Sequence, residues 1–349
     1  MIRFLCFAAC SVFLLAAALW AVASETAEDP YREYKEYFVP ITEKFVDNPE
    51  NPVTPEKVEL GWMLYHEPRL SKSGLFSCNT CHNPATWGMS KLPVDIGHKW
   101  RRTPVNSGTV FNAAYYKAQN WDGRAADLEE QAKGPILDEN EMAMPSEEFA
   151  VERIASIPEY VRRFQVSFPD EPEPLTFENI ANAIGAFERT LLTPGRWDRF
   201  LLGDNDALSD EEKAGMKTFV DTGCAGCHDG VVLGGDFEKL GVALPYESES
   251  PSRGRYDVTG NEADKDVFKM HTLRNIEHTY PYFPDGAVWE LEEAVRIMGE
   301  IQLGFELTDS ETEEIVTFLK ALTGEIPEHA LKLPVLPAST RDTPRPDPN

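Results

Sequence analysis

Apolar residues recur along this chain at the three- and four-residue spacing of helices, whereas the alternating runs typical of strands are rare. Acidic residues and Thr308 precede the last of these stripes and Gly324 follows it, which predicts a helix over about 310–322. The pattern predicts an all-α protein. Four stripes are assigned to core-facing helix sides: Leu60, Met63, Leu64; Ile180, Ala183, Ile184, Phe187, Leu191; Met216, Phe219, Val220; and Ile315, Phe318, Leu319, Leu322.

A series of short motifs occurs twice along the chain in the same order. The segment CNTCH at 78–82 recurs as CAGCH at 224–228, and a Glu-Lys pair precedes each of them. This shared order predicts two copies of one domain. The further matches are Glu56-Lys57 with Glu212-Lys213, TPVN at 103–106 with TLRN at 272–275, DG at 122–123 with DG at 285–286, and LEE at 128–130 with LEE at 291–293.

The repeat suggests how the chain is divided. We expect an N-terminal domain over 24–195 and a C-terminal domain over 205–325, with the boundary between Thr193 and Asp206. Residues 229–266 are rich in Gly, Ser and charge and are expected to form a long loop. Residues 326–349 hold many prolines and are expected to form an extended C-terminal tail.

The first 23 residues have the features of an export signal. Arg3 is the only charge among them, residues 4–23 are apolar, and Ala-Val-Ala at 21–23 fits a cleavage site. The alternative is an uncleaved membrane anchor, because about 20 apolar residues can span a bilayer. We favour cleavage and therefore predict a periplasmic protein.

The 349-residue chain is strongly acidic, with 33 Lys and Arg against 59 Asp and Glu. Nucleic acid and anionic membranes are poor partners for such a surface. A protein with a basic patch would be attracted to it over a long range, in a salt-dependent way. Solubility alone is the alternative explanation of the charge.

Four of the six cysteines lie outside the export signal, which contains Cys6 and Cys10. All four belong to the two C-x-x-C-H motifs, which are the attachment signature of c-type haem. A redox dithiol normally occurs in a βαβ context, and a zinc site needs four clustered ligands. We therefore predict two covalently bound c-type haems. The attaching residues are Cys78 and Cys81 with proximal His82, and Cys224 and Cys227 with proximal His228.

The second axial ligands must come from the remaining His and Met residues. Spacing alone selects none of the free histidines, which are His66, His98, His271, His278 and His329. Met298 is expected in the loop ahead of the last helix, where small cytochromes place a distal methionine, and Met270 is its competitor. A thioether ligand raises the reduction potential relative to a second imidazole, so the two haems are expected to differ in potential.

Longer segments around these motifs extend over nearly the whole mature chain: GWMLYHEPRLSKSGLFSCNTCHNPATWG (61–88), DIGHKW (95–100), NWDGRAADLEEQAKGPI (120–136), GCAGCH (223–228), FKMHTLRNIEHTYPYFPDGAVWELEEAV (268–295) and IMGEIQLG (297–304). In these segments the sequence resembles the bacterial di-haem cytochrome c peroxidases. This resemblance implies two cytochrome c-like domains, each with one covalent haem. The first haem would be peroxidatic and the second would accept electrons.

The resemblance also implies roles for individual residues. His98 matches the distal ligand of the first haem, which in most members leaves the iron once the second haem is reduced. Trp121 matches a tryptophan between the haems; ordinary packing is the alternative. Gln131 and Glu141 match polar residues over the opened iron. Glu141 would carry a proton from one peroxide oxygen to the other, so that water leaves.

A calcium site and one departure complete the comparison with this family. Asn106, Thr279 and Pro281 match residues that hold calcium between the domains through neutral oxygens, which suit a hard cation. Where the family often has His before Asp-Gly in the second domain, this chain has Pro284, which offers neither a side-chain donor nor an N–H.

The predicted reaction is reduction of hydrogen peroxide to water with electrons from a small cytochrome c or a blue copper protein. One alternative is a di-haem electron carrier, in which Glu141 and Gln131 would be idle. Another is a MauG-like enzyme that oxidises a partner protein, which would have Tyr in place of Met298. Family members are commonly homodimers, and we expect one here.

Overall fold

The structure, a computed structural model, describes residues 29–349. The predicted export signal, with Cys6 and Cys10, lies outside the described residues. The described chain falls into two compact units that divide after Glu36. The first contains helix α2 (Arg32–Lys35), where Lys35 pairs with Asp29 at 2.7 Å. All further description concerns the second unit, residues 37–349.

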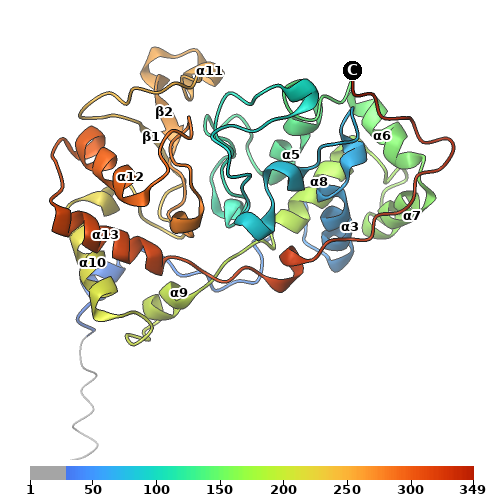
Figure 1. The fold of residues 1–349 in the computed structure, drawn as a ribbon. Coiled ribbons are helices and arrows are strands. Elements are labelled where there is room, and N and C mark those ends of the chain that lie inside the picture. The colour runs from blue at the N-terminus through green and yellow to red at the C-terminus, as the bar shows by residue number, and fades with distance from the viewer. Residues whose placement is uncertain (1–28) are drawn as a thin grey trace, which may run out of the picture. The chain divides into compact units, whose positions relative to one another are not determined.

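One group of helices surrounds the first C-x-x-C-H motif. Helix α3 packs against α8, and α8 packs against α5 (Figure 1). Gly61 permits the close approach of α3 and α8, because a Cβ atom there would lie 1.8 Å from the carbonyl oxygen of Ala183. The helices of this group are α3 (Pro55–Tyr65), α4 (Cys78–Cys81), α5 (Leu128–Leu137), α6 (Glu147–Ala155), α7 (Pro158–Ser167) and α8 (Phe177–Glu188).

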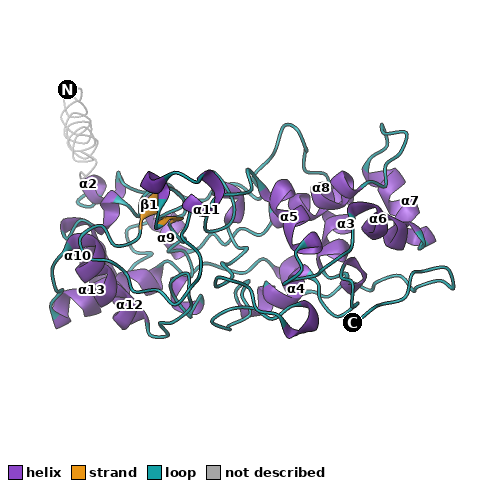
Figure 2. Cartoon of the chain, turned by 90° about the horizontal axis from the view of Figure 1, so that it is seen from above, coloured by secondary structure: helices purple, strands orange, loops and turns teal. Residues whose placement is uncertain are grey.

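A second group, separate from the first in both views, surrounds the second motif (Figures 1 and 2). Helix α10 packs against α13, and Gly215 allows this approach as Gly61 does, since a Cβ there would meet the Glu314 carbonyl oxygen at 2.0 Å. The helices are α9 (Arg196–Leu201), α10 (Asp210–Asp221), α11 (Tyr256–Thr259), α12 (Leu291–Met298) and α13 (Asp309–Ala321).

The four predicted apolar stripes lie on α3, α8, α10 and α13, and nearly all of their residues are buried. The segment 229–266, expected to be a loop, contains helix α11 and strand β1 (Phe237–Lys239). Strand β1 pairs antiparallel with β2 (Val267–Lys269), so that Phe237 lies opposite Lys269. The protein is therefore mostly helical, with one small hairpin-like sheet among the described residues.

Hydrogen bonds correct the predicted alignment of the two halves. Asn112 and Asn275 both have positive φ, 61° and 62°, and both precede a 3₁₀ turn. The N–H of Asn112 donates to the Leu191 carbonyl (2.9 Å) and that of Asn275 to the Leu322 carbonyl (3.2 Å). Segment 109–112, TVFN, is therefore the counterpart of TLRN. The predicted match of 103–106 with TLRN is wrong, because Thr-x-x-Asn occurs twice within ten residues and spacing does not show which asparagine caps the turn.

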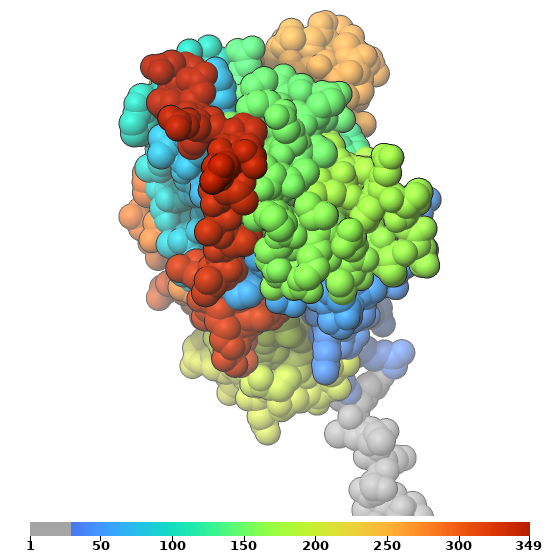
Figure 3. Space-filling model, turned by 90° about the vertical axis from the view of Figure 1, so that its right-hand side faces the viewer, coloured from blue at the N-terminus to red at the C-terminus, as the bar shows by residue number. Residues whose placement is uncertain are grey.

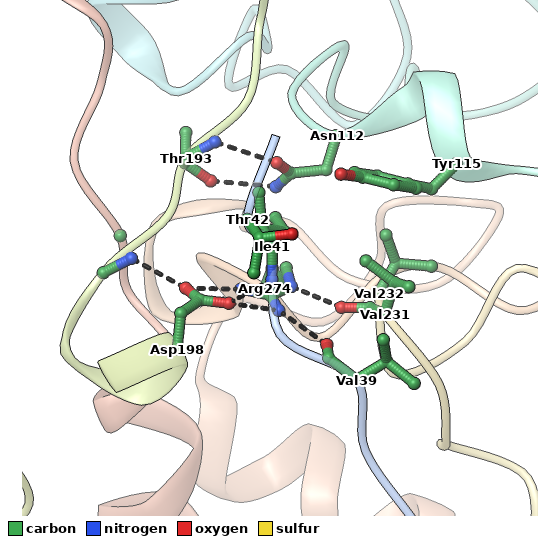
Figure 4. A network of polar contacts seen from close by, with 12 residues as sticks. Val39, Ile41, Thr42, Asn112, Tyr115, Thr193, Asp198, Val231, Val232 and Arg274 are labelled. Atoms are coloured by element: carbon green, nitrogen blue, oxygen red, sulfur yellow. Dashed lines mark hydrogen bonds and ion pairs between the residues drawn. The ribbon is translucent and has the colours of Figure 1, made fainter. Parts of the chain in front are cut away.

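The Thr193 hydroxyl accepts a hydrogen bond from each of these asparagines, so the two halves meet there. Its Oγ1 accepts from Asn112 Nδ2 at 2.8 Å and from Asn275 Nδ2 at 2.9 Å. Nearby, Asp198 of α9 pairs with Arg274, and both side chains are buried (Figure 4). This polar network ties the segment that links α8 and α9 to both halves.

The C-terminal segment crosses the surface of the first helix group (Figure 3). It contains one 3₁₀ turn, Glu328–Leu331, and no regular element after it. Trp62 Nε1 donates to the Lys332 carbonyl at 3.1 Å, and Ser156 Oγ donates to Thr343 Oγ1 at 2.8 Å. Side chains of the first group thus hold the segment in place.

Candidate functional site

A cavity of about 550 Å³, including the part open to solvent, lies at the first motif. Its wall includes Cys78, Cys81 and His82 together with Gln131 and Glu141. Burial raises the pKa of both thiols above its usual range. The His82 ring contacts the Gly88 carbonyl through Nδ1 at 3.3 Å. Since Nδ1 is engaged with the backbone, Nε2 is the nitrogen available to a metal.

Glu141 is brought to this cavity by the loop between α5 and α6. Burial, reinforced by the neighbouring carboxylate of Asp138, raises the pKa of Glu141 to about 7. A carboxyl group with such a pKa can both accept and release a proton near neutral pH. Gln131 reaches the same cavity from α5. The structure therefore brings together the two polar residues that the sequence resemblance paired.

His98 directly follows a residue of the cavity wall, Gly97. Its side chain is buried, and neither ring nitrogen has a hydrogen-bond partner. Its backbone N–H donates to the Glu141 carbonyl at 2.8 Å, which joins the two loops. Gly97, and not His98, is part of the cavity wall. A buried imidazole without partners is costly, and coordination of a metal would satisfy it.

A larger cavity, about 1310 Å³ including the part open to solvent, lies at the second motif. Cys224, Cys227 and His228 line it, and His228 Nδ1 contacts the Leu233 carbonyl at 3.0 Å. Met298 and Met270 both line it as well. Met298 is the last residue of α12 and is followed by a π-helical turn over Gly299–Leu303, so the prediction that it lies in a loop is wrong.

The backbone positions both proximal histidines in the same way. Thr109 Oγ1 donates to the Trp87 carbonyl and Thr272 Oγ1 donates to the Val232 carbonyl, both at 2.7 Å. Trp87 and Val232 directly precede Gly88 and Leu233, whose carbonyls contact the two imidazoles. The thiols, the oriented imidazole and the cavity at each motif fit a covalently attached haem.

Trp121 and the predicted calcium residues also line the larger cavity: Asn106, Thr279 and Pro281. Trp121 Nε1 donates to the Asn106 carbonyl at 2.7 Å. Asn106 Nδ2 donates to the carbonyls of Leu92 and Pro93, so its Oδ1 is the oxygen left for a cation. Within residues 29–349 no group of three His, Cys, Asp or Glu side chains could hold a metal ion, so a cation here would rest on neutral oxygens.

Two buried groups in the cavity walls were missed by the sequence reasoning. Glu188 lines the smaller cavity and Lys269 the larger one. Burial raises the pKa of Glu188 to about 8 and lowers that of Lys269 to about 7. A charge four residues after Ile184 on an otherwise apolar helix side was the signal that could have identified Glu188.

Comparison with known proteins identifies the family. Residues 55–206 match the family described as di-haem cytochrome c peroxidase. The chain is 50% identical over 305 residues to cytochrome c551 peroxidase of Nitrosomonas europaea, covering 86% of this chain and 90% of that relative. This chain belongs to the di-haem cytochrome c peroxidase family. Cytochrome c551 peroxidase of Pseudomonas aeruginosa is 47% identical, with 88% and 90% covered. The predicted membership of the di-haem cytochrome c peroxidases is confirmed, and the family implies c-type haems.

Solved structures agree on the fold. A MauG-like protein associated with microbial copper homeostasis has a TM-score of 0.76 at 26% identity, covering 89% of this chain and 99% of that chain. The diheme peroxidase BthA of Burkholderia thailandensis has a TM-score of 0.65 at 17% identity, with 86% and 94% covered, which supports the fold alone. Across residues 29–349, the helices are all too short or too polar to cross a membrane.

Proposed function

We propose that this cytochrome c peroxidase reduces hydrogen peroxide to two waters at the smaller cavity, with two protons and with two electrons from a small soluble redox protein. The observation that carries the proposal is the meeting of Glu141 and Gln131 with Cys78, Cys81 and His82 in one cavity. An electron carrier needs no acid–base group there. The donor would be a small cytochrome c or a blue copper protein.

The chain's own residues supply binding and proton transfer. Bound haem would supply the iron and the redox equivalents for cleavage of the O–O bond. Glu141 takes a proton from one peroxide oxygen and returns it to the other, so that the leaving group departs as water. Gln131 offers an amide donor and an acceptor to orient the peroxide beside Glu141. Both hydrogens of the leaving water then come from the peroxide itself.

The larger cavity would hold the electron-accepting haem on Cys224, Cys227 and His228, with Met298 as the second axial ligand. The duplicated helix pairs support two haem domains, over 24–195 and 205–325. Trp121, in the wall of the larger cavity and bonded to Asn106, is the residue proposed to couple the two haems. Calcium at Asn106, Thr279 and Pro281 would hold segments from both halves.

His98 is proposed as a gate on the smaller cavity. Its loop is joined to the Glu141 loop by a backbone hydrogen bond from the His98 N–H to the Glu141 carbonyl and by the exposed Arg101–Glu139 ion pair. Movement of His98 away from the haem would open the place that peroxide occupies. The acidic sequence fits a donor with a basic patch, and an export signal fits the periplasm. A homodimer is proposed from the family alone.

Turnover is expected to depend on prior reduction. Reduced small cytochrome c is mixed with peroxide and the holoenzyme, either as isolated or reduced by one electron with calcium present. Fast oxidation only after reduction is expected, because His98 must leave first. Fast oxidation in both states would discard the gate and keep the peroxidase. Absence of oxidation in both states, with both haems still reducible, would leave an electron carrier.

Replacement of Met298 by leucine is expected to lower the reduction potential of the second haem and change its absorption spectrum, because a thioether ligand is lost. Met270→Leu is the matched control, since both methionines line the same cavity. Spectroelectrochemical titration of both variants shows which of the two methionines is the ligand. If Met270→Leu gives the change and Met298→Leu does not, the assignment of the ligand is wrong.

A further inference from the structure

Glu188 is a buried acid that the peroxidase mechanism does not use. It is the last residue of α8, the residue is 5% exposed, and it lines the smaller cavity with Cys78 and His82. Its Oε2 atom is buried without a hydrogen-bond partner. An unpaired polar atom in a cavity wall is costly unless something that occupies the cavity interacts with it.

The internal repeat shows that this acid is peculiar to the first cavity. Ala183 and Glu314 are equivalent, because their carbonyls face Gly61 and Gly215 in the same way. Ile184 and Glu188 follow the first of these by one and five residues, and Ile315 and Leu319 follow the second at the same distances. Both equivalent pairs line their cavities. A carboxyl group therefore occupies, at the first haem, the place of a leucine at the second.

The groups around Glu188 leave it without a fixed counter-ion. The Glu129 carboxylate on α5 pairs with the guanidinium of Arg189 at 2.7 Å and accepts a hydrogen bond from the amide of Asn51 at 2.9 Å. Arg189 is thus engaged with Glu129, and the net influence of burial and Glu129 raises the pKa of Glu188 to about 8.

The remaining titratable neighbours are also acids or neutral. Tyr65 of α3 and the thiol of Cys78 on α4 interact electrostatically with Glu188, and the pKa of each is raised. In haem-loaded protein the Cys78 sulfur would be a thioether. Glu141 and Asp95 also line this cavity. Reduction of a haem bound there would change the charge that the iron adds to this acidic cavity.

We propose that Glu188 takes up a proton from solvent when the first haem is reduced and releases it when that haem is reoxidised. One electron from the donor protein enters the haem, and one proton converts the Glu188 carboxylate to the carboxylic acid, so the charge of the cavity stays constant. The oxidised haem would carry one more positive charge than the reduced haem and would therefore favour the Glu188 carboxylate, whereas the reduced haem would favour the carboxylic acid. This inference rests on the proposed place of the first haem and not on peroxide reduction.

The test is a spectroelectrochemical titration of the holoprotein from acidic to alkaline pH, without peroxide. Glu188 would have one pKa with the first haem oxidised and a higher one with it reduced. Between these two pKa values, each pH unit is expected to change the equilibrium constant for reduction of the first haem tenfold, which shifts its reduction potential by about 59 mV for one electron. Glu188→Gln, which keeps the size of the side chain, and Glu188→Leu, which copies the second cavity, should both abolish this dependence. The second haem, measured in the same samples, should be unaffected.

Glu139→Gln is the comparison variant, because Glu139 is an exposed carboxylate that pairs with Arg101 and lines neither cavity. It is expected to keep the pH dependence of the first haem. A pH indicator in weak buffer should show one proton fewer taken up per first haem reduced in Glu188→Gln. A reduction potential of the first haem that is independent of pH in the wild type overturns the proposal. So does a pH dependence that persists in Glu188→Gln or is lost in Glu139→Gln. Since no peroxide is present, failure of the peroxidase reaction would not affect this result.

Discussion

Glu141→Gln is expected to reduce kcat for peroxide-dependent cytochrome c oxidation by about 10²- to 10⁴-fold, the range for loss of one general acid–base group. Glutamine fills nearly the same volume of the smaller cavity but cannot accept a proton from peroxide. Steady-state oxidation of reduced cytochrome c by the pre-reduced holoenzyme measures the loss. The binding of haem should be unchanged, because Glu141 forms no part of the attachment motif.

The pH profile gives the same prediction a second readout. Glu141 must be ionised to take a proton, and burial raises its pKa to about 7. Wild-type activity should therefore rise with pH through about 7 and fall away on the acidic side. In Glu141→Gln this decline of activity at acidic pH should disappear along with most of the activity. If the decline persists unchanged in the variant, it is caused by the titration of another group.

Glu139→Gln is the matched control for this prediction. Glu139 lies two residues earlier in the same loop, but its side chain is 82% exposed and pairs with Arg101. The same chemical change there should leave kcat within a factor of about two, because surface ion pairs contribute about 0–1 kcal/mol to stability and this one does not reach the cavity. A large loss in both variants would indicate disturbance of the loop rather than loss of proton transfer.

Local patterns predicted the elements and the haem motifs well. The stripe at Leu60–Leu64 lies on α3 and the predicted helix over about 310–322 is α13, Asp309–Ala321. Helical spacing and caps are properties of neighbouring residues, so a single sequence contains them. The two C-x-x-C-H motifs are equally local. Roles that depend on the resemblance, such as those of His98 and Trp121, remain predictions.

What the sequence could not supply depends on contacts between distant segments. Glu188 becomes a cavity residue only because α8 turns its end toward Cys78, more than one hundred residues earlier in the chain. The register of the repeat could be assigned only from hydrogen bonds such as that from Asn112 to Leu191. Burial raises or lowers a pKa according to packing, so the sequence did not show which of the 59 carboxylates, Glu188 and Glu141 among them, has a raised pKa.

Arg274→Met is expected to lower the free energy of unfolding by about 3–5 kcal/mol, the range for removing one partner of a buried ion pair. Arg274 and Asp198 pair at 2.9 Å with side chains only 1% and 5% exposed. The guanidinium also donates to the carbonyls of Val231 and Val39, and Asp198 accepts from the Ile41 N–H (Figure 4). Without Arg274, the carboxylate stays buried without its counter-ion and these carbonyls lose a donor.

Guanidinium unfolding of the holoprotein, followed by both haem absorbance and far-ultraviolet circular dichroism, measures this effect as a lower midpoint. Arg296→Met is the control, since Arg296 pairs with Asp309 at a similar 2.7 Å but with side chains 42% and 98% exposed. It should cost less than about 1 kcal/mol. Equal losses in the two variants would mean that burial does not set the strength of the Arg274 pair. If haem absorbance changes at a lower denaturant concentration than circular dichroism in Arg274→Met, the Arg274–Asp198 pair would be needed to keep the haem environment intact before global unfolding.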